Sequence, residues 1–257
     1  MEIQSNHNLA LMLNGVHYNI ANIINGLVYE IIKTSRLDLI RIHFASVLLI
    51  LILMILVVHW LFPSRHAICN FCVRIIKAED DGRLYCRNRH QAVTCVLNSL
   101  QTFMGISKTV CQDAIEAGIV PLLRSTLSKT SYLDNLDANE PIMFLFQAST
   151  RILFHILQID ELKMFLNHYH YEILLGVLCR TKNSILRLLI FLTIARIARD
   201  RMIKFPLTID DVSIFFQVYY ESSKSKDKTA YGIKFEELCD GFRIIGQLES
   251  QYKTAHR

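Results

Sequence analysis

Cysteine and histidine side chains follow a long apolar run at spacings that could hold a metal ion. Cys69 and Cys72 form a Cys-x2-Cys pair, and after 13 intervening residues Cys86 and His90 form a Cys-x3-His pair. Thiolate and imidazole groups in such pairs are the ligands of tetrahedral zinc sites. A second interpretation is reversible acylation of Cys69 or Cys72 near a bilayer surface. A third, which we favour, is that the cysteines are unmodified thiols on a helix.

No motif in the chain predicts catalysis. The sequence contains no G-x-S-x-G, G-x-x-x-x-G-K-[ST] or G-x-G-x-x-G, so a nucleophile turn and a phosphate cradle are both missing. His155, His168 and His170 lack the paired spacing of HExxH, and we interpret them as structural residues. We therefore expect a protein that is not an enzyme, with no catalytic residue and no cofactor.

The spacing of three arginines suggests that they bind a partner. Arg196 and Arg199 lie three residues apart at the end of a helix expected over 184–198, and Arg187 lies near its start. On one helix face such cations would suit an acidic peptide. The alternative is a solvated helix face. The overall net charge of +5 is too mild and too dispersed for a nucleic-acid binder, and we expect no nucleic-acid partner.

The elements that position these residues begin with a predicted membrane helix. Residues 44–62 form 19 consecutive residues without a formal charge, flanked by Arg41 and Arg65. This length matches the ~20 residues that a helix needs to cross the hydrocarbon core. We expect a retained single-pass anchor over 43–62, with the weak arginine excess after it placing the downstream part in the cytosol.

The first 40 residues predict a second helical segment of different character. Asparagines interrupt the apolar stretch 9–32, and buried amides are costly in lipid. We expect residues 1–40 to form an amphipathic helix at the membrane interface, with insertion into the bilayer as the alternative. Residues 63–87 are then a juxtamembrane connector.

Residues 88–250 are predicted to form a helical domain with a polar insertion over 129–139. Apolar residues recur there at helical spacing, and the whole chain has only 9 glycines and 4 prolines, which favours long helices over a strand-rich fold. Within Val110 to Leu127, Gly118 separates two short helices and Pro121 lies in the first turn of the second. Residues 251–257 are expected to form a tail.

The stretch from Asp113 to Leu123 resembles the armadillo-repeat family, in which a short helix, a glycine and an apolar-x-Pro-x-Leu-Leu helix precede a longer third helix. Degenerate copies follow, with third helices expected over 141–157, 184–198 and 233–248. First and second helices are expected over 161–178, and a second helix over 209–220. The resemblance implies a solenoid whose third helices line a concave groove. Ser99 stands near a position where the family carries a groove Asn, and the single Trp is Trp60, so binding of nuclear-import cargo is not carried over.

Together these features predict an all-α protein with an N-terminal transmembrane helix and a short armadillo-like α-solenoid. We expect a non-catalytic scaffold or adaptor that docks a partner protein in its groove through Arg187, Arg196, Arg199 and Ser99. The resemblance implies the mitochondrial outer membrane as its location, with the endoplasmic reticulum as the alternative. The competing functions are a membrane-interface enzyme with a Cys/His zinc site and a structural subunit of a membrane complex.

Overall fold

A computed structural model describes residues 62–84, 89–166, 168–198 and 205–255. These residues are mostly helical, which confirms the predicted fold class at that level. The expected interface helix over 1–40 and membrane helix over 43–62 lie outside them, apart from Phe62. Within these ranges, no helix combines the length and the apolar character that crossing a bilayer requires.

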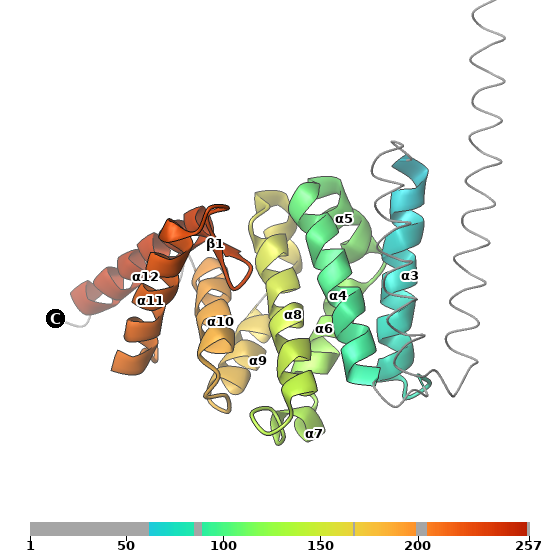
Figure 1. Ribbon diagram of the computed structural model, residues 1–257, viewed down its shortest axis with the longest axis horizontal. Helices are drawn as coiled ribbons and strands as arrows, with labels where there is room; N and C mark the ends of the chain where they lie inside the picture. The colour runs from blue at the N-terminus through green and yellow to red at the C-terminus, as the bar shows by residue number, and fades with distance from the viewer. Residues whose placement is uncertain (1–61, 85–88, 167, 199–204, 256–257) are drawn as a thin grey trace, which may run out of the picture. The chain divides into compact units, whose positions relative to one another are not determined.

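The chain divides into two compact units, and the first ends at Leu122. It contains α3 (Phe62–Asp80), α4 (Arg89–Ile106) and α5 (Lys108–Glu116), and each of these helices packs against the other two (Figure 1). The segment 63–87, expected as a connector, is therefore largely helix α3. Its apolar face, including Phe71 and Ile76, is buried. Packed helices thus begin upstream of residue 88.

The turn after α5 has the form that the sequence predicts. Gly118 follows α5 with φ of 93°, a left-handed conformation that residues with a Cβ rarely adopt, and α6 (Ile119–Ser128) begins at the next residue. Pro121 is the third residue of α6, where a missing N–H costs no hydrogen bond of the helix. The two residues therefore set the break between these helices.

The second unit, from Leu123 onward, is organised around α10 (Ser184–Ile197). This helix is apolar on every side and is buried almost throughout from Leu186. It packs against α8 (Glu140–Leu157), α9 (His168–Leu178), α11 (Ile209–Lys224) and α12 (Phe235–Ala255) (Figure 1). A helix without a polar face is stable in water only when neighbours cover it on all sides.

Polar caps set the starts of the helices around α10. The Asn139 side chain accepts a hydrogen bond from the Ile142 N–H at the start of α8, and Asn183 caps α10 in the same way. Thr208 and Asp211 form a reciprocal capping box at α11. Each cap satisfies N–H groups that a helix leaves without a partner in its first turn.

Short elements complete the second unit. The 3-10 helix η1 (Asp160–Phe165) packs against α8, and α7 (Thr130–Leu133) lies within the stretch expected as an insertion. Strands β1 (Thr229–Ala230) and β2 (Ile233–Lys234) form a hairpin that the sequence analysis missed. Tyr231 and Gly232, with φ of 53° and 73°, are its two central residues, as in a type I′ turn.

A glycine allows the close approach of α12 to α10. A Cβ built on Gly241 would lie 2.2 Å from Cδ2 of the buried Leu192 on α10, so a larger residue there would force the Leu192 side chain to move. Gly241 thus leaves room for the Leu192 side chain between the two helices.

Candidate functional site

A cavity of about 330 Å³ opens in the second unit between the C-terminal end of α8, η1, α10 and the first half of α12. It is lined by Leu157, Gln158, Asp160, Lys163, Arg196, Glu236, Glu237, Asp240, Arg243 and Ile244. The sequence analysis selected one of these residues, Arg196, as a partner-binding candidate. Cavities of this size lie at the small end of the range for ligand pockets, about 300–1,000 Å³.

Arg196 is the buried charge of this cavity. Its side chain is 7% exposed, its guanidinium lies 4.4 Å from the centre of the Phe154 ring, and Nη2 donates to Oδ2 of Asp240 at 3.0 Å. Among the described residues, Nη1 has no hydrogen-bond acceptor. A buried N–H of a charged group without an acceptor is costly, and the pair with Asp240 and the contact with the Phe154 ring offset part of this cost.

The surroundings of Arg196 partly compensate its burial. Burial lowers the pKa of Arg196, whereas the carboxylates of Asp240 and Glu237 act in the opposite direction and Arg243 adds to the lowering. Since a guanidinium stays protonated in proteins, Arg196 remains a cation. Stacking on the Phe154 ring also favours the charged form.

The carboxylates of the cavity are largely engaged by protein donors. Asp240 accepts from Arg196 with one oxygen and from Arg243 with the other. Glu237 accepts from Gln158 Nε2 at 2.8 Å and from the Lys234 N–H at 2.9 Å. Asp160 is paired with Lys163. The polar wall of the cavity is therefore organised by hydrogen bonds within the protein.

Arg187 has a structural position. Each of its side-chain nitrogens donates: Nε and Nη2 to the two oxygens of Asp211, and Nη1 to the carbonyls of Leu178 and Thr181. Its side chain is 17% exposed. Arg187 thus joins helices within the fold, and it does not offer its guanidinium to a partner as the sequence analysis expected.

The structure describes one of the other two partner-binding candidates. Ser99 is on α4 in the first unit, where its hydroxyl donates to the Cys95 carbonyl at 2.9 Å, one turn earlier on the same helix. Arg199 lies outside the described residues. Of the three candidates that the structure describes, only Arg196 lines the cavity.

The cysteines expected as zinc ligands or acylation sites are buried on α3. Burial raises the pKa of Cys72 to about 12, which keeps it a thiol at neutral pH, and Cys69 Sγ lies 3.8 Å from the Val110 carbonyl. Acylation of either residue would require α3 to leave its place against α4 and α5. Cys86 is outside the described residues, and His90 Nε2 lies 3.9 Å from Glu79.

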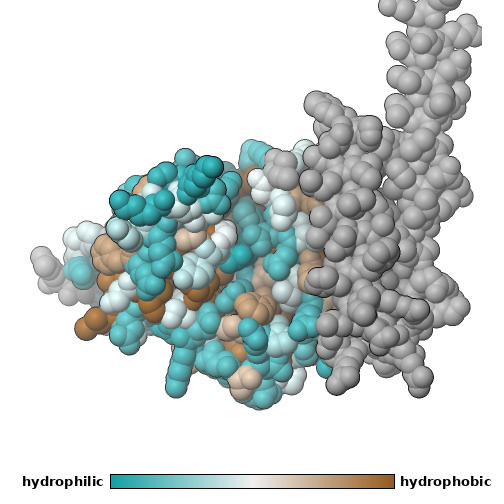
Figure 2. Space-filling model, in the orientation of Figure 1, coloured by the Kyte–Doolittle hydropathy of each residue, from teal (hydrophilic) through white to brown (hydrophobic). Residues whose placement is uncertain are grey.

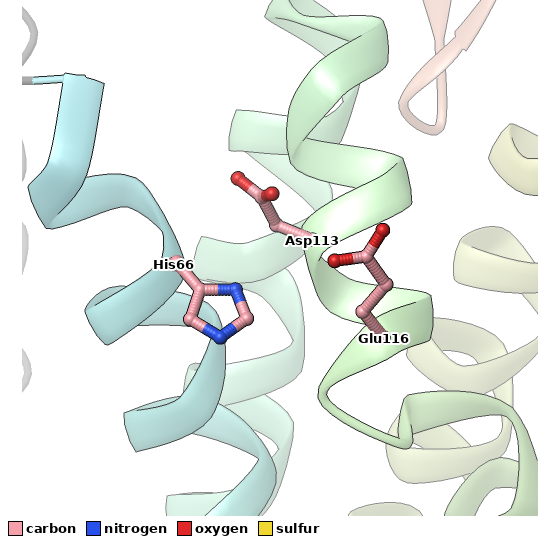
Figure 3. Close-up of side chains that lie close together, drawn as sticks. All are labelled: His66, Asp113 and Glu116. Carbon is pink, nitrogen blue, oxygen red and sulfur yellow. The ribbon is translucent and has the colours of Figure 1, made fainter.

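Figure 3 shows a group of potential metal ligands that the sequence analysis missed. His66 on α3 faces Asp113 and Glu116 on α5, and one ligand atom from each lies within 4.8 Å of the others. Glu116 also accepts a hydrogen bond from Gln112. No local motif announces the group, because 47 residues separate its histidine from its first carboxylate. His66 and Glu116 are exposed, so we base no function on this shallow surface group.

An apolar stripe lies on the solvent side of α11. Ile209, Val212, Phe216 and Tyr220 follow helical spacing and are 85%, 40%, 69% and 63% exposed. In Figure 2, hydrophobic residues are visible among hydrophilic ones over this helix. Exposed apolar stripes of this kind are typical of surfaces that meet other macromolecules.

No family model matches the chain, and no curated protein or solved structure matches it either.

Proposed function

We propose that this chain is a non-catalytic, armadillo-like scaffold that docks a segment of a partner protein in the cavity around Arg196. Residues 44–62 would fix it to a membrane, and the docking surface would face the cytosol. Tethering would raise the effective concentration of the scaffold near partners at the same membrane.

The helix order supports the solenoid part of this proposal. The segments expected as third helices correspond to α8, α10 and α12, and those expected as first and second helices correspond to η1, α9 and α11. α10 packs against both α8 and α12. Successive units that bury their apolar faces against each other in this way form one continuous core, as repeat proteins do.

The observation that carries the docking function is the cavity that α8, η1, α10 and α12 line, in which charged side chains of both signs gather around Arg196. Charged and polar groups held in place by the fold favour a partner of complementary charge over other partners. The rival function, a membrane-interface enzyme with a Cys/His site, has less support because Cys69 and Cys72 are buried on α3, which packs against α4 and α5.

Site-specific photo-crosslinking tests the docking function. A photoreactive residue replaces Glu236, which is exposed at the cavity, or Glu172, which is exposed on α9 away from it. The proposal expects a protein crosslinked through position 236 and not through 172, and expects Arg196→Lys to reduce its yield. Equal yields at the two positions, or lipid as the sole adduct at 236, would contradict it.

A second experiment tests the anchor and its location. The chain carries a fluorescent tag at either end, and intact organelles are treated with protease. We expect the C-terminal tag to be digested on the mitochondrial outer membrane, with the endoplasmic reticulum as the alternative membrane. A protein that is washed off either membrane by carbonate would remove the anchor from the proposal and leave the docking cavity untouched.

A further inference from the structure

We propose that two copies of this chain associate through the apolar stripe of α11, with their α11 helices antiparallel about a two-fold axis near Gln217. The dimer uses a surface other than the Arg196 cavity, because no residue of α11 lines that cavity. It therefore adds to the docking function and does not depend on it.

The helix α11 buries one face and leaves the opposite face uncovered. Phe215 and Val218 are buried where the helix packs against α10, α12 and β1. On the other side, Ile209, Phe216 and Tyr220 are each more than 60% exposed. They lie in one line that runs ~17 Å along the helix. Large apolar side chains that gather in this way on a surface mark a site of contact with another molecule.

A line of three polar side chains follows one edge of the apolar stripe. Asp210, Gln217 and Lys224 are spaced seven residues apart, which is about two helical turns, and all three are exposed. Lys224 Nζ lies 5.6 Å from the centre of the Tyr220 ring, so the cation stands beside the end of the stripe. Within the described ranges, neither Asp210 nor Lys224 is part of a salt bridge. The line thus carries an anion, an amide and a cation in order.

This order of charges is complementary to a second copy of itself. When two α11 helices pack antiparallel through the stripe, the same edge of each helix meets. Gln217 then faces Gln217 of the second copy, and Asp210 faces Lys224 of the second copy on both sides of the axis. A two-fold axis produces self-complementary contacts of this kind. The antiparallel helix dipoles also attract each other.

Other occupants fit the line less well. A parallel pair of α11 helices would bring Asp210 to the level of Asp210 in the second copy, and like charges repel. A surface of anionic lipid would repel the same carboxylate. A contact of one helix with one helix lies at the small end of interface sizes, below about 1,200 Å². We therefore expect a weak dimer, which the concentration of copies at one membrane would favour.

Disulfide formation near the axis tests the arrangement. Full-length chains with Gln217→Cys, Ser213→Cys or Glu172→Cys are oxidised in lipid vesicles, and the unsubstituted chain gives the background from native cysteines such as the exposed Cys179. Two copies of position 217 meet at the axis, whereas two copies of position 213 are ~12 Å apart along it, beyond the reach of a disulfide. We expect a covalent dimer from Gln217→Cys. Ser213→Cys should give no more than Glu172→Cys, an exposed control on α9.

Charge exchange tests the pairing, with the Gln217→Cys dimer as its readout. Asp210→Lys leaves two cations on the line and Lys224→Asp leaves two anions, so each variant alone should give about fivefold less dimer. A mixture of the two variants should recover the dimer, because both contacts again join a lysine and an aspartate. This recovery also shows that both variants are folded. Phe216→Ser should reduce the yield as well, since it removes the exposed ring next to the axis.

The results that would overturn the dimer are distinct. Equal yields from Ser213→Cys and Gln217→Cys would contradict the antiparallel arrangement. Yields that ignore the two charge variants would contradict the pairing of Asp210 with Lys224. The stripe does not join two copies if Gln217→Cys gives no more dimer than Glu172→Cys at any ratio of protein to lipid. Quenching of a fluorophore at position 217 by brominated lipid would assign the stripe to the bilayer surface instead. Each of these outcomes leaves docking at the Arg196 cavity unaffected.

Discussion

The guanidinium of Arg187 donates hydrogen bonds to both carboxylate oxygens of Asp211, with Nε 2.5 Å from Oδ1 and Nη2 2.8 Å from Oδ2. Asp211 also closes the capping box of α11 by accepting from the Thr208 N–H and hydroxyl. Through Nη1, Arg187 reaches the carbonyl of Leu178 at the end of α9. One side chain on α10 thus connects the end of one helix with the start of another.

Removal of this link should destabilise the protein. Arg187→Met leaves Asp211, 4% exposed, without its bidentate partner, and the loss of one member of a buried pair costs about 3 kcal/mol. Urea unfolding of the full-length chain measures the change. Arg180→Met, an exposed arginine that bonds only within its own turn, is the control and should cost less than about 0.5 kcal/mol. Equal losses for the two variants would mean that the Arg187 pair adds nothing.

Acidification should weaken the second unit through two histidines, the buried His170 and the half-buried His155. Burial is the first cause that lowers the pKa of His155 and of His170, so the folded protein favours their neutral forms. The unfolded chain takes up protons near its ordinary pKa of about 6.5. Stability is therefore complete above that pH and is lost as the pH falls toward the lowered folded values.

Thermal unfolding at pH 7.5 and pH 5.5 checks this expectation. The midpoint temperature of unfolding should be lower at pH 5.5 than at pH 7.5. His155→Gln should make this fall in midpoint temperature smaller. A fall that is identical in His155→Gln and the wild type would assign the effect to other groups.

Two glycines should respond in opposite directions to the same substitution. Gly232 has φ of 73°, and a Cβ there would lie 2.6 Å from Arg151 Nη1, so Gly232→Ala should cost about 2 kcal/mol. Gly246 lies within α12 with open space around the added carbon, so Gly246→Ala should stabilise by roughly 0.5–1 kcal/mol. Denaturant unfolding compares them. A gain from Gly232→Ala would contradict the strained hairpin turn.

The apolar stripe on α11 should contribute to interaction rather than to stability. Phe216 is 69% exposed, so Phe216→Ser should change the free energy of unfolding by less than about 0.5 kcal/mol. It should reduce binding of a hydrophobic dye and any self-association seen by light scattering, because it removes the largest exposed ring of the stripe. Phe215→Ser, one residue earlier and buried, should instead destabilise by about 3 kcal/mol. Similar losses of stability in both variants would show that the stripe is covered.

The sequence predicted the helices well, since each depends on neighbouring residues. The periodicity over 184–198 and the Gly118–Pro121 spacing act within a few turns, and α10 and the α5–α6 break appear where expected. Helical spacing says which residues share a face but not what that face meets. Arg187 and Arg196 are equivalent in the sequence pattern. Their different positions depend on their carboxylate partners Asp211 and Asp240, which are 24 and 44 residues away in the sequence.

Other features were missed for related reasons. The strands β1 and β2 have two residues each, too few for an alternating pattern to be recognised. The Asp113 and Glu116 carboxylates lie one turn apart on α5, but the position of His66 beside them depends on the packing of α3. The segment 63–87 was expected to be a juxtamembrane connector. Its apolar residues also fit a helix that packs against two others, as α3 does.

The apolar surface of α10 matters while the chain is being synthesised on the ribosome. Translation proceeds from the N-terminus, so α10 leaves the ribosome before α11 and α12, two of the helices that enclose it. During that interval the nascent chain exposes an apolar helix that consists mainly of leucines and isoleucines, with one phenylalanine. An mRNA truncated before α12 would yield a protein in which α10 is never fully buried. Cellular quality control would recognise this product as misfolded.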